Sequence, residues 1–171
     1  KIKLDSILKT IESFKNLKIC VVGDTIVDEY IFCKPLGMSQ EDPTIVVTPI
    51  DTKKFIGGAG IVSSHAAGLG AKVDFFSVVG NDEIGKFCLK KLEEFKVNSS
   101  LLVDNTRPTS LKQRFRCEAK TMLRVSHLQQ STISKYLQNK LFAKLEKKIK
   151  NYDILIFADF NYGCLPQDLV D

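Results

Sequence analysis

The 171-residue sequence has no apolar stretch long enough to cross a membrane as a helix. Its longest apolar runs, such as residues 154–158, are a few residues long, whereas a membrane-spanning helix needs roughly 20. Near the N-terminus, apolar residues recur on one face of a predicted helix over residues 1–15 and do not form a continuous signal region. We therefore expect neither a membrane partner nor export.

Cysteine is present, but not in the pairs that indicate disulfides or zinc. The five cysteines are widely separated, and none stands at CxxC spacing. They are Cys20, Cys33, Cys88, Cys117 and Cys164. A reducing cytoplasm fits this pattern best.

Groupings of metal ligands or of a nucleophile with its base are missing as well. Neither His65 nor His127 has a cysteine, a histidine or a carboxylate at metal-ligand spacing, so we interpret both as structural and expect no metal site. Cys164 has no base near it in the sequence and is not interpreted as a nucleophile.

Long runs of one charge do not occur. The chain has 25 Lys and Arg against 20 Asp and Glu, interspersed, for a net charge of +5. A nucleic-acid-binding domain concentrates basic residues among aromatic stacking groups, and neither pattern is present. We expect no nucleic-acid partner, although the mild positive excess could favour a phosphorylated small molecule.

What the sequence does contain is an alternation of short β-branched runs and amphipathic helices. The predicted buried strands cover residues 18–22, 72–79 and 153–157. The predicted helices cover residues 61–69, 84–96 and 133–149, the last with Ser131 or Thr132 as its N-cap. This alternation is typical of an α/β fold with a mainly parallel sheet.

Two other regions predict a small separate β layer. Residues 45–48 lie between Pro43 and Pro49, and such prolines confine a strand to an edge or to a separate sheet. Two β-like runs, residues 111–117 and 121–128, flank a polar turn and predict a hairpin. We expect these segments to lie together on the α/β core.

Candidate binding residues follow the first predicted strand, where open α/β sheets bind ligands. Asp28 could accept hydrogen bonds from two sugar hydroxyls, or else Asp24 or Asp28 closes a turn or caps a helix. The glycine turn at residues 57–60 could let backbone and a helix N-terminus approach a polar ligand, or could be only a tight strand-to-helix turn.

Basic residues gather on the predicted hairpin. Alternation places Lys112, Arg114 and Arg116 on one face, and Arg124 stands on the second run. Such a row of cations could hold a phosphate group, with arginine as the bidentate partner. A solvated strand face is the alternative.

In order and spacing, these segments resemble the N-terminal half of the PfkB-type, ribokinase-like carbohydrate kinases over nearly the whole chain. The matching segments are residues 21–30, 38–47, 55–60, 69–71, 78–85, 123–125 and 158–163. Within that family the chain looks most like the heptose-7-phosphate kinase module that is associated with a nucleotidyltransferase.

The resemblance implies a ribokinase-like α/β fold whose mainly parallel sheet is flanked by helices. It adds a β lid, at about residues 30–55 and 111–128, that covers the sugar and forms a homodimer. It also implies transfer of a phosphoryl group from ATP, accompanied by Mg²⁺, to a hydroxyl of a sugar or sugar phosphate.

The resemblance further implies roles for particular residues. Asp28, Gly57 and Gly58 contact sugar hydroxyls; Lys112, Arg114 or Arg124 approaches a substrate phosphate; and Asp159 faces the cleft from a strand end. Two positions depart from the family: Ile61 stands where many relatives have asparagine, and Tyr162 stands where the heptose kinases have lysine.

The family's Gly-x-Gly-Asp segment, which supplies an anion hole and the proton-accepting aspartate, maps beyond Asp171. We therefore expect residues 1–171 to be the sugar-binding part of a kinase, to contain no catalytic residue, and to bind neither ATP nor Mg²⁺ alone. The alternative is a noncatalytic sugar-binding or regulatory module. A dinucleotide-binding domain is disfavoured because no G-x-G-x-x-G follows the first strand.

Overall fold

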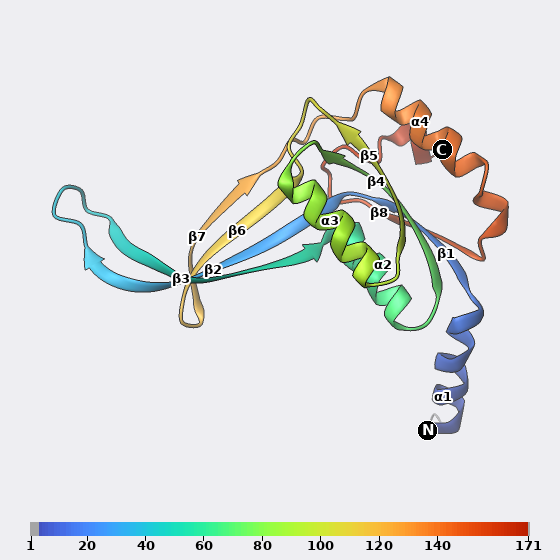
Figure 1. The fold of residues 1–171 in the computed structure, drawn as a ribbon, viewed down its shortest axis with the longest axis horizontal. Helices are drawn as coiled ribbons and strands as arrows, with labels where there is room; N and C mark the ends of the chain where they lie inside the picture. Colours follow the sequence, from blue (N-terminus) through green and yellow to red (C-terminus); the bar gives the residue numbers. More distant parts are fainter. Residues whose placement is uncertain (1–3, 171) are drawn as a thin grey trace.

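The computed structural model describes residues 4–170 and places their strands in two sheets, which we call the core sheet and the lid sheet (Figure 1). The core sheet has the strand order β5-β4-β1-β8, and all of its neighbouring strands run parallel. Its strands are β1 (Lys18–Gly23), β4 (Lys72–Gly80), β5 (Asn98–Asp104) and β8 (Ile154–Ala158). The predicted α/β fold with a parallel sheet is confirmed.

Helices cover both faces of the core sheet because its strands are apolar on both sides. One face packs against α2 (Gly58–Gly68) and α3 (Glu83–Glu94), and the other against α4 (Lys135–Glu146) and α5 (Gln167–Val170). Successive residues of β1 alternate between the two clusters: Val21 packs on the α2 side and Val22 on the α4 side. This two-sided burial fixes the register of β1 at the centre of the sheet.

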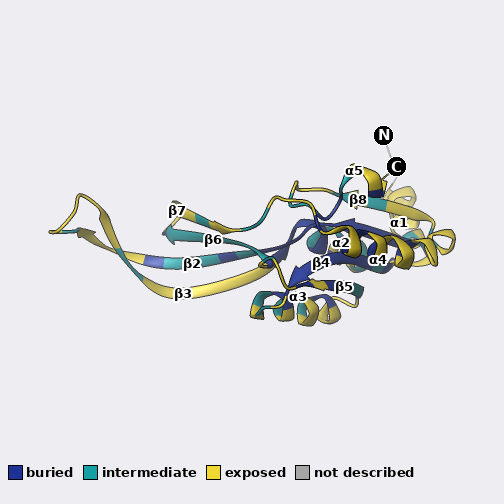
Figure 2. Ribbon diagram, turned by 90° about the horizontal axis from the view of Figure 1, so that it is seen from above, coloured by how far each residue is buried: buried dark blue, intermediate teal, exposed yellow. Residues whose placement is uncertain are grey.

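The lid sheet has the order β3-β2-β6-β7 and extends away from the core (Figure 2). Its strands are β2 (Thr25–Met38), β3 (Ile45–Gly57), β6 (Ser110–Cys117) and β7 (Lys120–His127). One residue, Asp24, separates β1 from β2, so the chain passes directly from the core into the lid. The lid strands thus begin nearer the core than the predicted segments 30–55 and 111–128.

The predicted hairpin and edge strand are present. β6 and β7 pair antiparallel, and β3 lies at the edge of the lid sheet. Pro49 is accommodated within β3 because an edge strand leaves one side unpaired, and the pairing with β2 shifts register beside it.

One boundary prediction was wrong, and one strand was missed. The N-cap of α4 is Ser134, whose hydroxyl accepts from the Leu137 N–H at 3.3 Å, and not Ser131 or Thr132. The chain stays extended until Ser134 because Ile133 is buried and donates its N–H to the Gly163 carbonyl at 3.0 Å. The strand β5 was not predicted, since it begins with polar residues.

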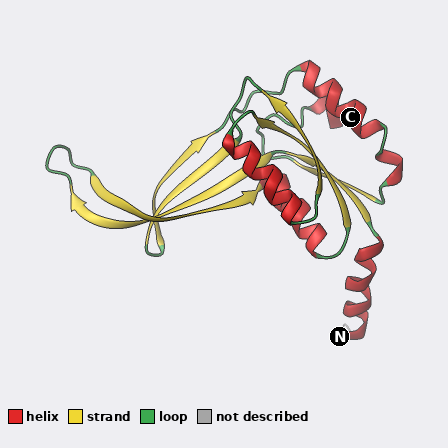
Figure 3. Ribbon diagram, in the orientation of Figure 1, coloured by secondary structure: helices red, strands yellow, loops and turns green. Residues whose placement is uncertain are grey.

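The remaining helical segments lie at the periphery. The helix α1 (Leu4–Ser13) projects from the body of the molecule with no buried residue and leads into the short helix η1 (Phe14–Asn16) (Figure 3). A second short helix, η2 (Ile149–Asn151), precedes β8. Within residues 4–170, no helix has the length and apolar character required to span a membrane.

Candidate functional site

The carboxyl ends of β1 and β8 meet the base of the lid sheet at Asp24. Its carboxylate is 3% exposed and accepts three backbone hydrogen bonds from the loop after β8. The donors are the N–H groups of Phe160, Tyr162 and Cys164, at 2.8, 3.2 and 3.1 Å. Burial raises the pKa of Asp24, and the three backbone N–H groups oppose that rise. Asp24 therefore holds the loop after β8 in place. This agrees with the alternative interpretation of the sequence, in which Asp24 closes a turn.

A buried arginine holds the same loop from the other side. Arg107 donates from Nη1 to the Tyr162 carbonyl at 3.1 Å and from Nη2 to the Ser131 carbonyl at 2.8 Å. Its Nε pairs with Asp104 at 3.0 Å, and both side chains are less than a tenth exposed. Sequence reasoning missed Arg107, and the signal available was an acidic residue three positions before an arginine in a polar loop.

Asp28 lies on β2 where the lid leaves the core. Its carboxylate forms an ion pair with Arg114, and both side chains are only partly buried. A Cβ atom on Gly57 would lie 2.6 Å from Asp28 Oδ2, so only glycine permits this close approach. Arg114, predicted to approach a phosphate, pairs with Asp28 through Nη1.

The glycine turn is tight. Gly58 has a φ of 55°, and a Cβ there would lie 2.4 Å from the Asp24 carbonyl oxygen. That carbonyl accepts from the Ala59 N–H at 2.9 Å, which ties the start of α2 to the end of β1. The strand-to-helix turn, one of the two readings of the sequence, is present; Gly57 lies next to the Asp28 carboxylate, whereas Gly58 lies against Asp24 and Ile26.

The predicted row of cations lies on the same lid face as Asp28. In the parallel pairing of β2 with β6, Asp28 stands opposite Lys112, and Tyr30 stands opposite Arg114. In the antiparallel pairing of β6 with β7, Arg114 stands opposite the exposed Arg124. Because register partners point to the same side of a sheet, the structure brings these side chains together.

Aromatic side chains intervene between the cations. The rings of Tyr30 and Phe55 meet edge to face at 5.8 Å, and Arg114 lies over Tyr30 at 5.3 Å. An open pocket of about 440 Å³ follows on this face. It is lined by Asp28, Tyr30, Phe32, Phe55 and Arg116. Sequence reasoning missed the aromatic residues, because their period-two spacing also fits an ordinary strand.

Asp159 does not join this group. It is exposed at the end of β8, and its carboxylate accepts from the Asn161 N–H at 2.8 Å. Asn161 has a φ of 61°, so Asp159 closes the turn that brings the chain back towards Asp24. Nearby, burial raises the pKa of the Cys164 thiol to about 12, so this thiol stays protonated near neutral pH.

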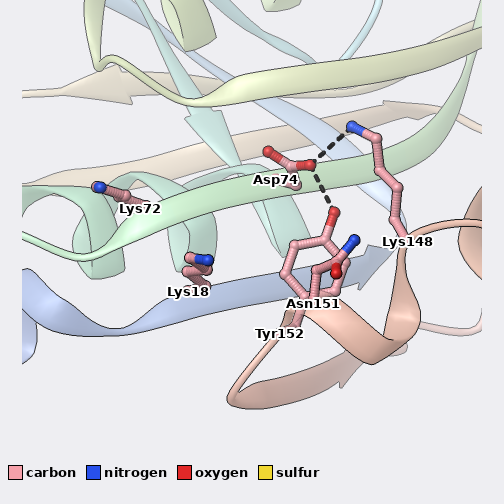
Figure 4. A pocket seen from close by; sticks show the side chains of 6 residues that line it. All are labelled: Lys18, Lys72, Asp74, Lys148, Asn151 and Tyr152. Atoms are coloured by element: carbon pink, nitrogen blue, oxygen red, sulfur yellow. Dashed lines mark hydrogen bonds and ion pairs between the residues drawn. The ribbon is translucent and has the colours of Figure 1, made fainter.

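A second pocket, of about 290 Å³, lies at the other end of the core strands, where β1 and β4 begin (Figure 4). In it the Asp74 carboxylate accepts from Lys148 at 2.9 Å and from the Tyr152 hydroxyl. The side chains of Lys18 and Lys72 flank this group at the amino ends of β1 and β4. Open α/β sheets bind ligands at the carboxyl ends of their strands, so we do not assign the functional site here.

Two features of the described residues bear on Mg²⁺ and on phosphate binding. Residues 4–170 include no cluster of three or more His, Cys, Asp or Glu side chains that could hold a metal ion. The amide at the start of α2 is occupied by the Asp24 carbonyl, so this turn does not offer it to a phosphate.

The described geometry can be compared with known proteins. The family described as pfkB family carbohydrate kinase matches residues 16–170. The chain belongs to the pfkB family. Curated pfkB relatives include the bifunctional protein HldE of Aliarcobacter butzleri, which is 33% identical over 91% of this chain and 33% of the relative. The bifunctional protein HldE of Helicobacter hepaticus is 34% identical over 91% of the chain and 32% of the relative.

Solved structures agree on the fold. A carbohydrate kinase from Agrobacterium tumefaciens has a TM-score of 0.63 at 15% identity, covering 90% of this chain and 48% of its own. A microbiome-derived acarbose kinase has a TM-score of 0.56 at 18% identity, covering 82% and 45%. The ribokinase-like fold is thereby confirmed, and the dinucleotide-binding alternative is set aside. The pfkB chain spans about a third of the length of the curated relatives it matches.

Proposed function

We propose that this pfkB chain forms the sugar-binding part of an ATP-dependent carbohydrate kinase, which transfers a phosphoryl group to a hydroxyl of a sugar or sugar phosphate. The observation that carries the proposal is Asp28, a partly exposed carboxylate at the junction of core and lid. Gly57 presents no side chain beside it, and a row of cations continues from it along the lid.

In this proposal the residues of the chain bind and orient the substrate. Asp28 accepts hydrogen bonds from two neighbouring sugar hydroxyls, and its ion pair with Arg114 fixes its position. Lys112 faces an anionic group on the sugar. MgATP, held by the part of the family fold that maps beyond residue 171, supplies the phosphoryl group. A heptose phosphate is the specific substrate that the resemblance suggests.

A noncatalytic sugar-binding module remains the second candidate because two positions depart from the family. Ile61, where many relatives have asparagine, packs against the apolar cluster on the α2 side and offers no polar group to a sugar. Tyr162 replaces the lysine of the heptose kinases.

An ADP-release assay separates the two candidates. The purified 171-residue chain and the protein of the complete reading frame are each given MgATP and a panel of sugars and sugar phosphates. We expect sugar-dependent ADP release from the complete protein and none above background from the 171-residue chain. General-base catalysis contributes roughly 10² to 10⁴-fold, and anion-hole donors a similar factor.

Turnover by the 171-residue chain alone would contradict the division of labour proposed here. A complete protein that binds sugar, shown by calorimetry, but releases no ADP would instead establish the noncatalytic module.

A further inference from the structure

The lid and the core meet in a contact between a cation and an aromatic ring. Lys112 Nζ on β6 lies 5.0 Å from the centre of the Tyr162 ring, in the loop that follows β8. An ammonium group at this distance over a tyrosine face is attracted by the negative potential of the ring. Lys112 belongs to the lid sheet and Tyr162 to a loop of the core, so the contact depends on how core and lid are joined.

The backbone of Tyr162 is held on both sides. Its N–H donates to Asp24 at 3.2 Å, and its carbonyl accepts from Arg107 at 3.1 Å. Asp24 is buried, the Arg107 side chain is less than a tenth exposed, and both have further partners. The ring is therefore supported by a network that exists before any ligand arrives.

Lys112 differs from its neighbour Arg114 in what compensates its charge. Arg114 pairs with Asp28, whereas no carboxylate forms an ion pair with Lys112 among residues 4–170. A neutral ring orients an ammonium group without neutralising it, as a carboxylate would. The charge of Lys112 thus remains without an ion-pair partner, on the residue that stands opposite Asp28 in the pairing of β6 with β2.

We propose that Tyr162 is a positioning residue that holds the Lys112 ammonium group at the junction of core and lid, so that a cation without an ion-pair partner faces an anionic group of the substrate. The substrate part of this inference rests on the proposed function. The contact between Lys112 and the Tyr162 ring also gives a physical consequence to the presence of tyrosine, where the heptose kinases have lysine, at position 162. A lysine at that position would face Lys112 with a like charge, and a tyrosine attracts it.

The contact between Lys112 and the Tyr162 ring can be tested without any substrate. Lysines are dimethylated with ¹³C-formaldehyde, and the Lys112 signal is assigned with Lys112→Arg. We expect an upfield ring-current shift of the Lys112 methyl signal that Tyr162→Phe keeps and Tyr162→Leu abolishes. An unchanged Lys112 signal in folded Tyr162→Leu would contradict the claim that the Tyr162 ring positions Lys112. If Tyr162→Leu fails to fold, Tyr162→Phe and Tyr162→Lys give the same comparison.

Its effect on recognition is measured by calorimetry on the protein of the complete reading frame, with heptose 7-phosphate and the same heptose without phosphate. We expect Tyr162→Leu to weaken the phosphate ester by about 3- to 10-fold and to leave the free heptose unchanged, with Tyr162→Phe restoring the affinity. In a Lys112→Met background, Tyr162→Leu should have no further effect.

Equal weakening of both ligands, or an undiminished effect in the Lys112→Met background, would refute positioning through Lys112. If the unaltered protein binds neither heptose nor its phosphate, the substrate proposal fails, while the methyl signal still decides whether Tyr162 seats Lys112.

Discussion

The core sheet and the lid sheet have four strands each but differ in what covers them. The core sheet lies between helices, and β1 is buried from its second residue to its last. The lid sheet extends away from the helices of the core, and β3 is mostly exposed. Figure 2 shows the same division, with burial concentrated in the core. Apolar packing thus specifies the core, whereas strand pairing and contacts between polar side chains specify the face of the lid that bears Asp28.

The two faces of the lid also differ from each other. One carries Asp28 and the cations. The other carries a small apolar cluster, in which Ile31, Cys33 and Cys117 are buried with Phe115 packed against them. The lid therefore has one face suited to a polar ligand and another suited to an apolar neighbour.

The sharpest test of this comparison uses two phenylalanines. Phe75 in β4 is 0% exposed, and Phe55 in β3 is 51% exposed. We expect Phe75→Ala to lower the free energy of unfolding by about 3 to 5 kcal/mol, because it leaves a cavity in a closed core. Phe55→Ala should cost about 1 kcal/mol or less, mainly the edge-to-face pair with Tyr30. Urea unfolding measures both, and equal losses would show that the lid is packed like the core.

A second prediction concerns a substitution that lowers the affinity for sugar but hardly changes the free energy of unfolding. Asp28→Ala, in the protein of the complete reading frame, should weaken sugar binding by about 1.5 to 3 kcal/mol, which is roughly 10- to 150-fold. The loss arises because a charged acceptor for two hydroxyls is removed. The unfolding free energy should change far less, since the pair with Arg114 is partly exposed. Unchanged sugar affinity in calorimetry would remove Asp28 from the site.

A third prediction addresses the apolar lid face. We propose that it forms a homodimer contact, because Leu123 is exposed beside Phe115 on the lid and a second lid could cover both. Leu123→Glu should weaken dimerisation at least about tenfold in sedimentation velocity, by placing a charge in the contact. Leu89→Glu on α3 is the control, since Leu89 is similarly exposed outside the lid. A strictly monomeric unaltered protein at high concentration would exclude the contact.

The smallest expected effect is a pH dependence in the core. Burial acts to raise the pKa of Asp82, but hydrogen bonds from Thr109 and from the Gly85 N–H outweigh it and hold that pKa below its usual range. A carboxyl with a lowered folded pKa stabilises the protein above its unfolded pKa, near 3.9, and loses this contribution as the pH falls through the folded value.

Asp82→Asn should therefore cost about 1 kcal/mol at pH 7, because the NH₂ of an amide cannot accept where the second carboxylate oxygen does. The difference from the unaltered protein should shrink between pH 5 and pH 2. Urea unfolding across this range measures it. Two curves that run parallel down to pH 2 would show that Asp82 does not contribute through its charge.

The sequence by itself determined the parallel core, the hairpin and the edge strand with its prolines. These follow from local patterns: β-branched apolar runs, helical periodicity and prolines that cannot pair. It also placed Lys112, Arg114 and Arg116 on one face, since alternation in a strand is a local property.

Only the tertiary structure decided which partners these residues meet. Three contacts join segments that are far apart in the chain. Asp24 and Arg107 both bind the loop after β8, and Lys112 lies over the Tyr162 ring. A buried carboxylate or guanidinium needs hydrogen-bond partners, but the sequence around it does not say which backbone groups supply them. Those partners are set when β1, β8 and the lid strands come together, because packing of the core fixes where each strand ends.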